Sequence, residues 1–350
     1  MRPRLLLAAL PLLVAACADE VVAVGPVAGE PVDVAAMLRP LNLLDSQDQK
    51  EGRLVYMGIL RLDSADIRFG GISGLVVSAD GLNFLAVTDA GHWLWGDLAY
   101  DGDGWLAGVR NVRLAPLLDP EGRALDGKEE SDAEGLTAAR PNDLSGDVLV
   151  SFERDHRIWR YEWGTYGAAA RAWPVPVNAE VSRLPDNASL EAIAAVDGTI
   201  FYAGEQGFED GPKDADGEGL ETPLWTACLD SCVEQSFTLA LVPPFSVTDM
   251  AVTPDRQLLT LERHFSPLTG VRAQLRLLPM EEFSREAPVN GPVIASFGPG
   301  DVLDNMEGVS VRRGAHGETL VYLVSDDNFN RGVQATLLML FRLEGPESVQ

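Results

Sequence analysis

Residues 134–153, which read EGLTAARPNDLSGDVLVSFE, carry the pattern that decides the fold. A short apolar stretch follows Glu134, a turn comes next, and a second apolar stretch ends in another acid, Glu153. Apolar stretches of this length, separated by Pro, Asn, Asp and Gly, are typical of a β-hairpin. Five segments in all share the pattern, and they cover residues 73–89, 134–153, 191–205, 249–262 and 307–326.

The spacing of these segments indicates a repeat architecture. They begin at residues 73, 134, 191, 249 and 307, so that successive starts are 61, 57, 58 and 58 residues apart. Each hairpin is followed by enough chain for two more strands, for example 157–164 and 223–230. Units of four strands repeated at a fixed period predict a β-propeller, an all-β fold.

The two ends of the chain are expected to close the ring. The fifth unit runs out after residues 336–343, which supply only its third strand. Residues 53–63, RLVYMGILRLD, read as a strand and would complete that blade, which removes the exposed sheet edges. We therefore predict five blades. The alternatives are a sixth, degenerate blade within residues 20–70 and, as a different fold, a β-sandwich.

The N-terminal segment reads as an export signal. Residues 1–17, MRPRLLLAALPLLVAAC, combine two arginines with an apolar stretch too short to span a bilayer. The end of this segment resembles the lipobox of bacterial lipoproteins, which implies lipidation of Cys17 and anchoring at the cell envelope, outside the cytoplasm. The alternative is an ordinary cleavage site with an incidental cysteine. Residues 18–52 read as a tether, and residues 53–345 as the propeller domain.

The remaining cysteines, Cys228 and Cys232, are four residues apart. A structural zinc site needs four ligands and the chain has no second pair. An exported protein can keep a disulfide, so we expect Cys228 and Cys232 to form one, with two free thiols as the alternative.

The charge of the chain excludes one class of partner. There are 53 acidic and 27 basic residues, the net charge is −26, and only three residues are lysines: Lys50, Lys128 and Lys213. Nucleic acids are bound by clustered cations, which this composition does not supply. An anionic membrane surface would also repel the chain, so any membrane attachment is expected through the lipid anchor alone. We expect a monomer.

Acidic residues recur at two positions of the repeat. In a propeller blade the start of the first strand and the end of the second lie at the same face. Both sets should therefore converge at one end of the central channel. The first set is Ser73, Glu134, Glu191, Asp249 and Glu307, and the second is Asp89, Glu153, Glu205, Glu262 and Asp326.

A ring of nine carboxylates needs compensation. Two such groups about 5 Å apart repel by roughly 3 kcal/mol at an effective dielectric constant near 20. Protons, arginines or a bound cation could relieve this repulsion. Oxygen ligands without cysteine indicate Ca²⁺. The alternative is structural: each acid could accept hydrogen bonds from backbone amides and hold neighbouring blades together.

Histidines and arginines follow three of these acids. His92, His156 and His264 lie just beyond Asp89, Glu153 and Glu262, while Arg154 and Arg263 directly follow two of them. We predict catalytic roles for Glu153, for His156 or His264 in proton transfer, and for Arg154 or Arg263 in holding an anion. The alternative for each histidine is an ordinary residue on the rim of the channel.

Several segments resemble the "esterase-like activity of phytase" family of bacterial exported proteins. They are GISGL at 71–75, DAEGL at 132–136, SFERDHRIWRYE at 151–162, LERHFSP at 261–267, DNMEGVS at 304–310 and SDDNFN at 325–330. The resemblance covers about residues 66–343. It implies a β-propeller, hydrolysis of phosphoesters or esters, and calcium. Phytate is a polyanion that needs a basic cleft, and three lysines argue against it as the substrate.

Two functions from different classes follow. The first is a lipid-anchored, Ca²⁺-dependent hydrolase of small phosphate or carboxylic esters, with metal held by Asp89, Glu134, Glu191, Glu205, Asp249, Glu262, Glu307 and Asp326. The second is a non-catalytic propeller that calcium stabilises and that binds a glycan or a protein.

Overall fold

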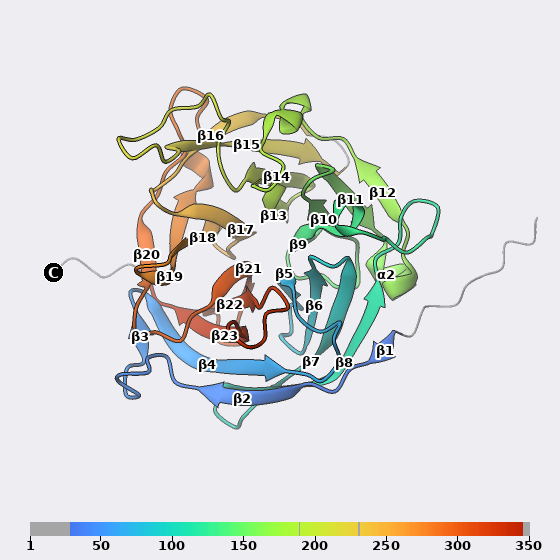
Figure 1. The fold of residues 1–350 in the computed structure, drawn as a ribbon, viewed down its shortest axis with the longest axis vertical. Helices are drawn as coiled ribbons and strands as arrows, with labels where there is room; N and C mark the ends of the chain where they lie inside the picture. The colour runs from blue at the N-terminus through green and yellow to red at the C-terminus, as the bar shows by residue number, and fades with distance from the viewer. Residues whose placement is uncertain (1–28, 189, 230–231, 346–350) are drawn as a thin grey trace, which may run out of the picture.

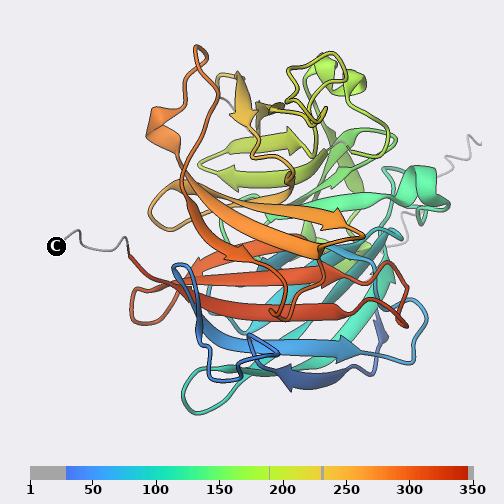
Figure 2. The same ribbon diagram turned by 60° about the vertical axis from the view of Figure 1, so that its left-hand side comes forward.

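The computed structural model describes residues 29–188, 190–229 and 232–345. Its strands form five sheets arranged in a ring around a common axis, as Figure 1 shows, and Figure 2 shows the same ring turned by 60°. The fold is therefore a five-bladed β-propeller, as the repeat predicts. No helix among the described residues is long and apolar enough to cross a membrane.

Each blade is an antiparallel sheet whose first strand lines the channel. Blade 1 contains β5 (Ile72–Val77), β6 (Asn83–Thr88), β7 (His92–Tyr100) and β8 (Leu106–Pro116). Blade 2 contains β9 (Ala133–Ala138), β10 (Val148–Phe152), β11 (Arg157–Tyr161) and β12 (Ala172–Val175). Blade 3 contains β13 (Leu190–Val196), β14 (Thr199–Gly204), β15 (Glu221–Cys228) and β16 (Ser236–Ala240).

The last two blades follow the same plan. Blade 4 contains β17 (Ser246–Val252), β18 (Gln257–Ser266), β19 (Gly270–Pro279) and β20 (Val293–Phe297). Blade 5 begins with β21 (Asn305–Arg313), β22 (Thr319–Asp326) and β23 (Thr336–Leu343). Short helical segments lie in the connections: α1 (Lys128–Ser131), α2 (Trp163–Tyr166), η1 (Gly167–Ala169), η2 (Ala179–Arg183) and η3 (Met280–Glu282).

A strand from the N-terminal part of the chain completes blade 5. Strand β4 (Leu54–Asp63) pairs antiparallel with β23, so the two ends of the propeller domain share one sheet. This is the closure that the sequence predicts for residues 53–63. It covers the hydrogen-bonding edge that β23 would otherwise expose.

Residues 29–52 are not a tether. They form β1 (Glu30–Pro31), which pairs with β8, and β2 (Ala35–Arg39) and β3 (Lys50–Glu51), which both pair with β4. Val32 and Leu41 are buried in apolar clusters of the propeller. The apolar residues of this segment, which show no clear period in the sequence, cover outer strands of the propeller. The segment extends blades 1 and 5 and does not form a sixth blade. The predictions for residues 1–17, Cys17 included, lie outside the described residues.

Apolar packing between blades holds the ring together. Five buried clusters are present, and each one joins the facing sides of two neighbouring blades. Burial of this apolar surface is the main stabilising force. At the end of β15, Cys228 is joined to Cys232 by a disulfide.

Closure by β4 makes a truncation test possible. A chain that begins at Ser64 lacks β4 and exposes the edge of β23, so we expect it to aggregate or to lose cooperative unfolding. A chain that begins at Arg53 keeps β4 and loses β1–β3, so we expect a folded monomer with a lower melting temperature. Size-exclusion chromatography and thermal unfolding followed by circular dichroism measure both. Wild-type melting of the chain that begins at Ser64 would contradict this account of closure.

Candidate functional site

A β-bulge near the start of every inner strand sets up the site. In each blade the pairing between the first two strands skips one residue of the first strand. Such an extra residue is left out of the ladder and its side chain is re-aimed. The skipped residues occupy equivalent positions at one end of the channel, here called the mouth, and they are Ser73, Glu134, Glu191, Thr248 and Glu307.

The residues that follow the second strands occupy the other equivalent position. In each blade the residue just before the bulge pairs with a residue near the end of the second strand, which is Thr88, Phe152, Gly204, Glu262 or Ser325. The residue that follows each of these five in the chain reaches the mouth. These next residues are Asp89, Glu153, Glu205, Arg263 and Asp326. Four of the five are the acids that the sequence places there.

Blade 4 differs from the sequence prediction by one residue at both positions. Thr248 stands where Asp249 was expected, and Arg263 stands where Glu262 was expected. Side chains alternate between the faces of a strand, so a slip of one residue directs each side chain to the other side. Asp249 and Glu262 are therefore not among the acids of the mouth.

Asp249 has the structural role that was the alternative in sequence. Its side chain is fully buried and accepts hydrogen bonds from the amides of Met250 at 2.8 Å and of Val309 at 2.7 Å. A further amide bond comes from Ile193. Burial raises the pKa of Asp249, and these amides oppose the rise. Asp249 thus joins the inner strands of blades 3, 4 and 5.

Glu262 is paired inside the sheet of blade 4. The guanidinium of Arg276 donates from Nε to Glu262 Oε1 over 2.5 Å, and Gln274 Nε2 donates to Glu262 Oε2 over 2.6 Å. Arg276 is fully buried and also donates to the carbonyl of Ala240 in blade 3. This carboxylate already has full compensation, which is why it is available neither to a metal nor to a substrate.

The hydroxyl positions of the mouth tie blades together. Ser73 Oγ donates to the carbonyl of Ala133 over 2.5 Å, and Thr248 Oγ1 donates to the carbonyl of Met306 over 3.0 Å. Each accepting carbonyl directly precedes a bulged glutamate of the next blade, Glu134 or Glu307. The ties therefore fix the backbone that presents two of the acids.

Eight acids meet at the mouth, and we call them the mouth carboxylates. Seven of them are predicted from sequence. The eighth is Asp132, which lies two residues before the bulge of blade 2 and is 1% exposed. The set is Asp89, Asp132, Glu134, Glu153, Glu191, Glu205, Glu307 and Asp326, and mutual electrostatic contacts connect its members. Asp327 is buried beside Asp89 and Asp326, but its Oδ1 accepts hydrogen bonds from the amides of Gly71 and Phe329.

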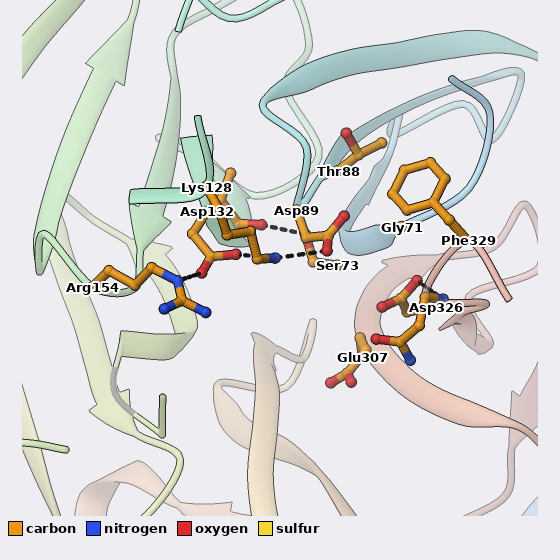
Figure 3. A network of polar contacts seen from close by, with 12 residues as sticks. Gly71, Ser73, Thr88, Asp89, Lys128, Asp132, Arg154, Glu307, Asp326 and Phe329 are labelled. Atoms are coloured by element: carbon orange, nitrogen blue, oxygen red, sulfur yellow. Dashed lines mark hydrogen bonds and ion pairs between the residues drawn. The ribbon is translucent and has the colours of Figure 1, made fainter. Parts of the chain in front are cut away.

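Three cations lie among these acids. The ammonium of Lys128 is 2.7 Å from Asp89 Oδ2 and 2.5 Å from Asp132 Oδ1, and Arg154 Nε donates to Asp132 Oδ2 over 2.6 Å (Figure 3). On the other side, an Nη atom of Arg263 is 3.2 Å from Glu307 and 3.6 Å from Glu205. Two of these cations were predicted as anion clamps, and the structure places both against carboxylates.

Burial leaves several mouth carboxylates with raised pKa values. Burial is the largest cause for Glu134 and Glu191, and repulsion from Asp132 and Glu205 respectively adds to it. Burial also raises the pKa of Glu307 to about 7, although Arg263 opposes it. Burial and the neighbouring Asp89 raise the pKa of Asp326. Without a further cation the mouth must therefore retain protons.

The donor set fits a hard divalent cation. Oxygen atoms of Asp132, Glu134 and Glu153 all lie within 4.8 Å of one another. Glu191 Oε2 is buried and accepts no hydrogen bond from the described residues. Carboxylate oxygens without sulfur or imidazole are the ligands of Ca²⁺ and Mg²⁺. The mouth thus offers charge that the protein itself does not neutralise.

Each of the three histidines lies shortly after a residue of the mouth in the chain. His156 follows Glu153 in the turn between β10 and β11 and is partly exposed. His264 lies beyond Arg263, and its ring centre is 6.1 Å from that of Phe245. His92 is partly buried beyond Asp89, and burial, followed by the charge of Arg68, lowers its pKa.

Sequence reasoning missed three polar residues of the site. Asp132 and Asn305 both lie two residues before a bulged glutamate, and this shared spacing was the signal that could have found them. Asn305 Nδ2 donates to Glu307 Oε1 over 2.6 Å. Lys128 carries no such signal, because it comes from a connection between blades.

A family profile matches most of the chain. The sequence profile of the phytase-like family, described as "Esterase-like activity of phytase", matches residues 67–329. The chain belongs to this family. The match contains every mouth carboxylate. No curated protein sequence matches the chain.

Solved structures with a similar arrangement have low sequence identity. A gluconolactonase from Xanthomonas campestris, XC5397, is 13% identical with a TM-score of 0.41, over 91% of this chain and 97% of that one. A luciferin-regenerating enzyme is 10% identical with a TM-score of 0.39, over 80% and 94%. The propeller domain of Cps50 (Swd1) from Myceliophthora thermophila is 10% identical with a TM-score of 0.38, over 89% and 100%. These values support no inference about a site.

The structural role of Asp249 can be tested by its removal. Asp249→Ala leaves buried amides of several inner strands without an acceptor, so we expect a loss of about 3 kcal/mol or more in the free energy of unfolding. Urea unfolding measures it. Asp255→Ala removes an exposed acid that pairs with Arg313 and should cost less than about 1 kcal/mol. Equal losses in the two variants would contradict the role of Asp249.

The raised pKa values predict how stability depends on pH. Glu307 has a pKa of about 7 when folded and 4.5 ordinarily, so the folded state binds more protons than the unfolded state between these values. Stability of the metal-free protein should therefore fall as pH rises from 5 to 8, by on the order of 3 kcal/mol from Glu307 alone. Thermal unfolding in chelator measures it. A higher melting temperature at pH 8 than at pH 5 would contradict this electrostatic description.

Proposed function

We propose that the protein is a metal-dependent hydrolase of small esters, with Ca²⁺ as the cation. The convergence of eight carboxylates at one channel mouth is the observation that supports it. Glu134, Glu153 and Glu191 would hold the ion, next to Asp132. Membership of a family described by esterase-like activity supports the same reaction class.

The oxygen spacing favours this part of the mouth. Two ligands at about 2.4 Å from one Ca²⁺ can be at most about 4.8 Å apart. Asp132, Glu134 and Glu153 bring oxygens within 4.8 Å of one another. Glu205 and Glu307, in contrast, already share Arg263, Asp89 already has Lys128, and Asp132 has both Lys128 and Arg154. The ion is therefore proposed between blades 2 and 3.

Residues around this position can serve an ester reaction. A bound Ca²⁺ would supply Lewis-acid polarisation of a carbonyl or phosphoryl oxygen. Glu307, with its pKa of about 7, can accept or release a proton at neutral pH. His156, in the turn after Glu153, is the second candidate for proton transfer, with His264 on the blade 4 side. Arg154 orients Asp132 through the Nε hydrogen bond.

Charge favours uncharged carboxylic esters over phosphate esters. A phosphate monoester brings about two negative charges to a mouth that keeps several carboxylates after one cation is bound. A neutral ester meets no such repulsion. Phosphate esters remain within the proposal only through direct contact with the cation.

Export and anchoring complete the proposal. The sequence of residues 1–17 supports export to the bacterial envelope with Cys17 as the lipid attachment site. Outside the cytoplasm, calcium reaches the 10⁻⁴–10⁻³ M range at which extracellular modules bind it. A monomer would suffice, because a single ring supplies the whole mouth.

Substitution of the proposed ligands tests the function. Glu134→Gln, Glu153→Gln and Glu191→Gln should each weaken Ca²⁺ binding by about 100-fold and remove turnover, while the fold survives. Glu129→Gln is the matched control, since it removes one exposed acid near the mouth. Metal analysis and calorimetry measure binding, and p-nitrophenyl acetate and p-nitrophenyl phosphate with and without EDTA measure turnover.

Two results would redirect the proposal. Protein purified without metal, and with the same melting temperature in calcium and in EDTA, would eliminate the metal. Calcium that raises the melting temperature, with no turnover of either ester, would favour the non-catalytic propeller that binds a glycan or a protein.

A further inference from the structure

Lys128 enters the mouth from outside the blades. It begins α1, a short helix in the connection from β8 to β9, and its neighbours Glu129 and Glu130 are exposed. The side chain is 49% exposed, whereas Asp132 is 1% exposed. Lys128 therefore reaches inward from a surface segment to the carboxylates of Asp89 and Asp132 (Figure 3).

The acids around its ammonium depend on Lys128 for part of their compensation. Asp89 Oδ1 is buried and accepts no hydrogen bond from the described residues. This atom lies against the backbone of Gly71, where a Cβ would be only 2.2 Å from it. Asp132 Oδ1 is also buried, and its partner is the ammonium of Lys128, 2.5 Å away.

Different cationic side chains therefore neutralise different carboxylates of the mouth. Lys128 serves Asp89 and Asp132, and Arg263 serves Glu205 and Glu307. No ion pair with Lys or Arg is found in the described structure for Glu134 or Glu191. A cation position with buried oxygens thus exists at Lys128, separate from the one proposed for Ca²⁺.

A tethered ammonium is an effective competitor for such oxygens. It is held near them at a high effective concentration, and a divalent ion must displace it to bind. Because Arg154 also contacts Asp132, the charge left for an incoming ion is small. Removal of the ammonium would leave a partly buried carboxylate from blade 1 and a buried one from the connection into blade 2.

We propose that Asp89 and Asp132 form a second cation position of the mouth, that Lys128 is its resident cation, and that Lys128 thereby limits the wild-type mouth to one divalent ion. The position belongs to the chemistry of hard cations, because its ligands are carboxylate oxygens. The expected number of bound divalent ions rests on the proposed function, whereas the role of Lys128 rests on the contacts of Lys128 itself.

The test counts bound Ca²⁺ in the full-length protein. Calorimetric titration with Ca²⁺ and metal analysis after dialysis are made on the wild type, Lys128→Met and Lys213→Met. Lys213 is exposed in the loop between β14 and β15, so its removal makes the same change in net charge. We expect one more bound Ca²⁺ per chain in Lys128→Met than in the wild type, and no change in Lys213→Met. Adding Asp89→Asn to Lys128→Met should abolish the extra ion.

The outcomes separate this inference from the proposed function. One ion in the wild type and one in Lys128→Met, with equal affinity, would overturn the inference and leave the proposed function intact. No ion in the wild type and one in Lys128→Met would support the inference and count against the proposed metal site. If Lys128→Met does not fold without calcium, Lys128→Arg restores the charge, and an extra ion in that variant would overturn the inference.

Discussion

Repulsion between carboxylates is the constraint on which the centre of this propeller depends. Eight acids gather at one channel mouth, and burial raises the pKa values of most of them. Arg263 from blade 4 and Lys128 from the connection into blade 2 offset part of the charge. Protons or a metal ion must offset the rest. Which carboxylates each cation neutralises determines what the mouth can bind.

The backbone presents these acids through one device used five times. A bulge near the start of each inner strand turns one side chain toward the mouth. Blades 2, 3 and 5 use a glutamate there, whereas blades 1 and 4 use Ser73 and Thr248 to tie the ring. The bulge thus places a hydroxyl that links neighbouring blades in two blades and a carboxylate of the mouth in three. Asp249, below the bulge of blade 4, adds amide bonds between inner strands.

Most of the fold could be predicted from the sequence because the repeat is local and regular. Hairpin turns and apolar strands recur every 57–61 residues, and β4 has the composition of the strand that blade 5 lacks. The site could be predicted less completely. In blade 4 the acids Asp249 and Glu262 mimic the repeat, but the bulge falls at Thr248. Residues 29–52 lack a clear period because they serve only as edge strands.

The sequence by itself determined the five repeats, the closing strand and the acidity of the channel, since these follow from strand patterns and composition. Only the tertiary structure decided which acids face one another. Strand alternation converts a shift of one residue into a change of side, and no pattern of acids alone reveals where a bulge falls. The cations of the mouth were likewise decided in three dimensions, because Lys128 and Arg263 meet their carboxylates from other blades and connections.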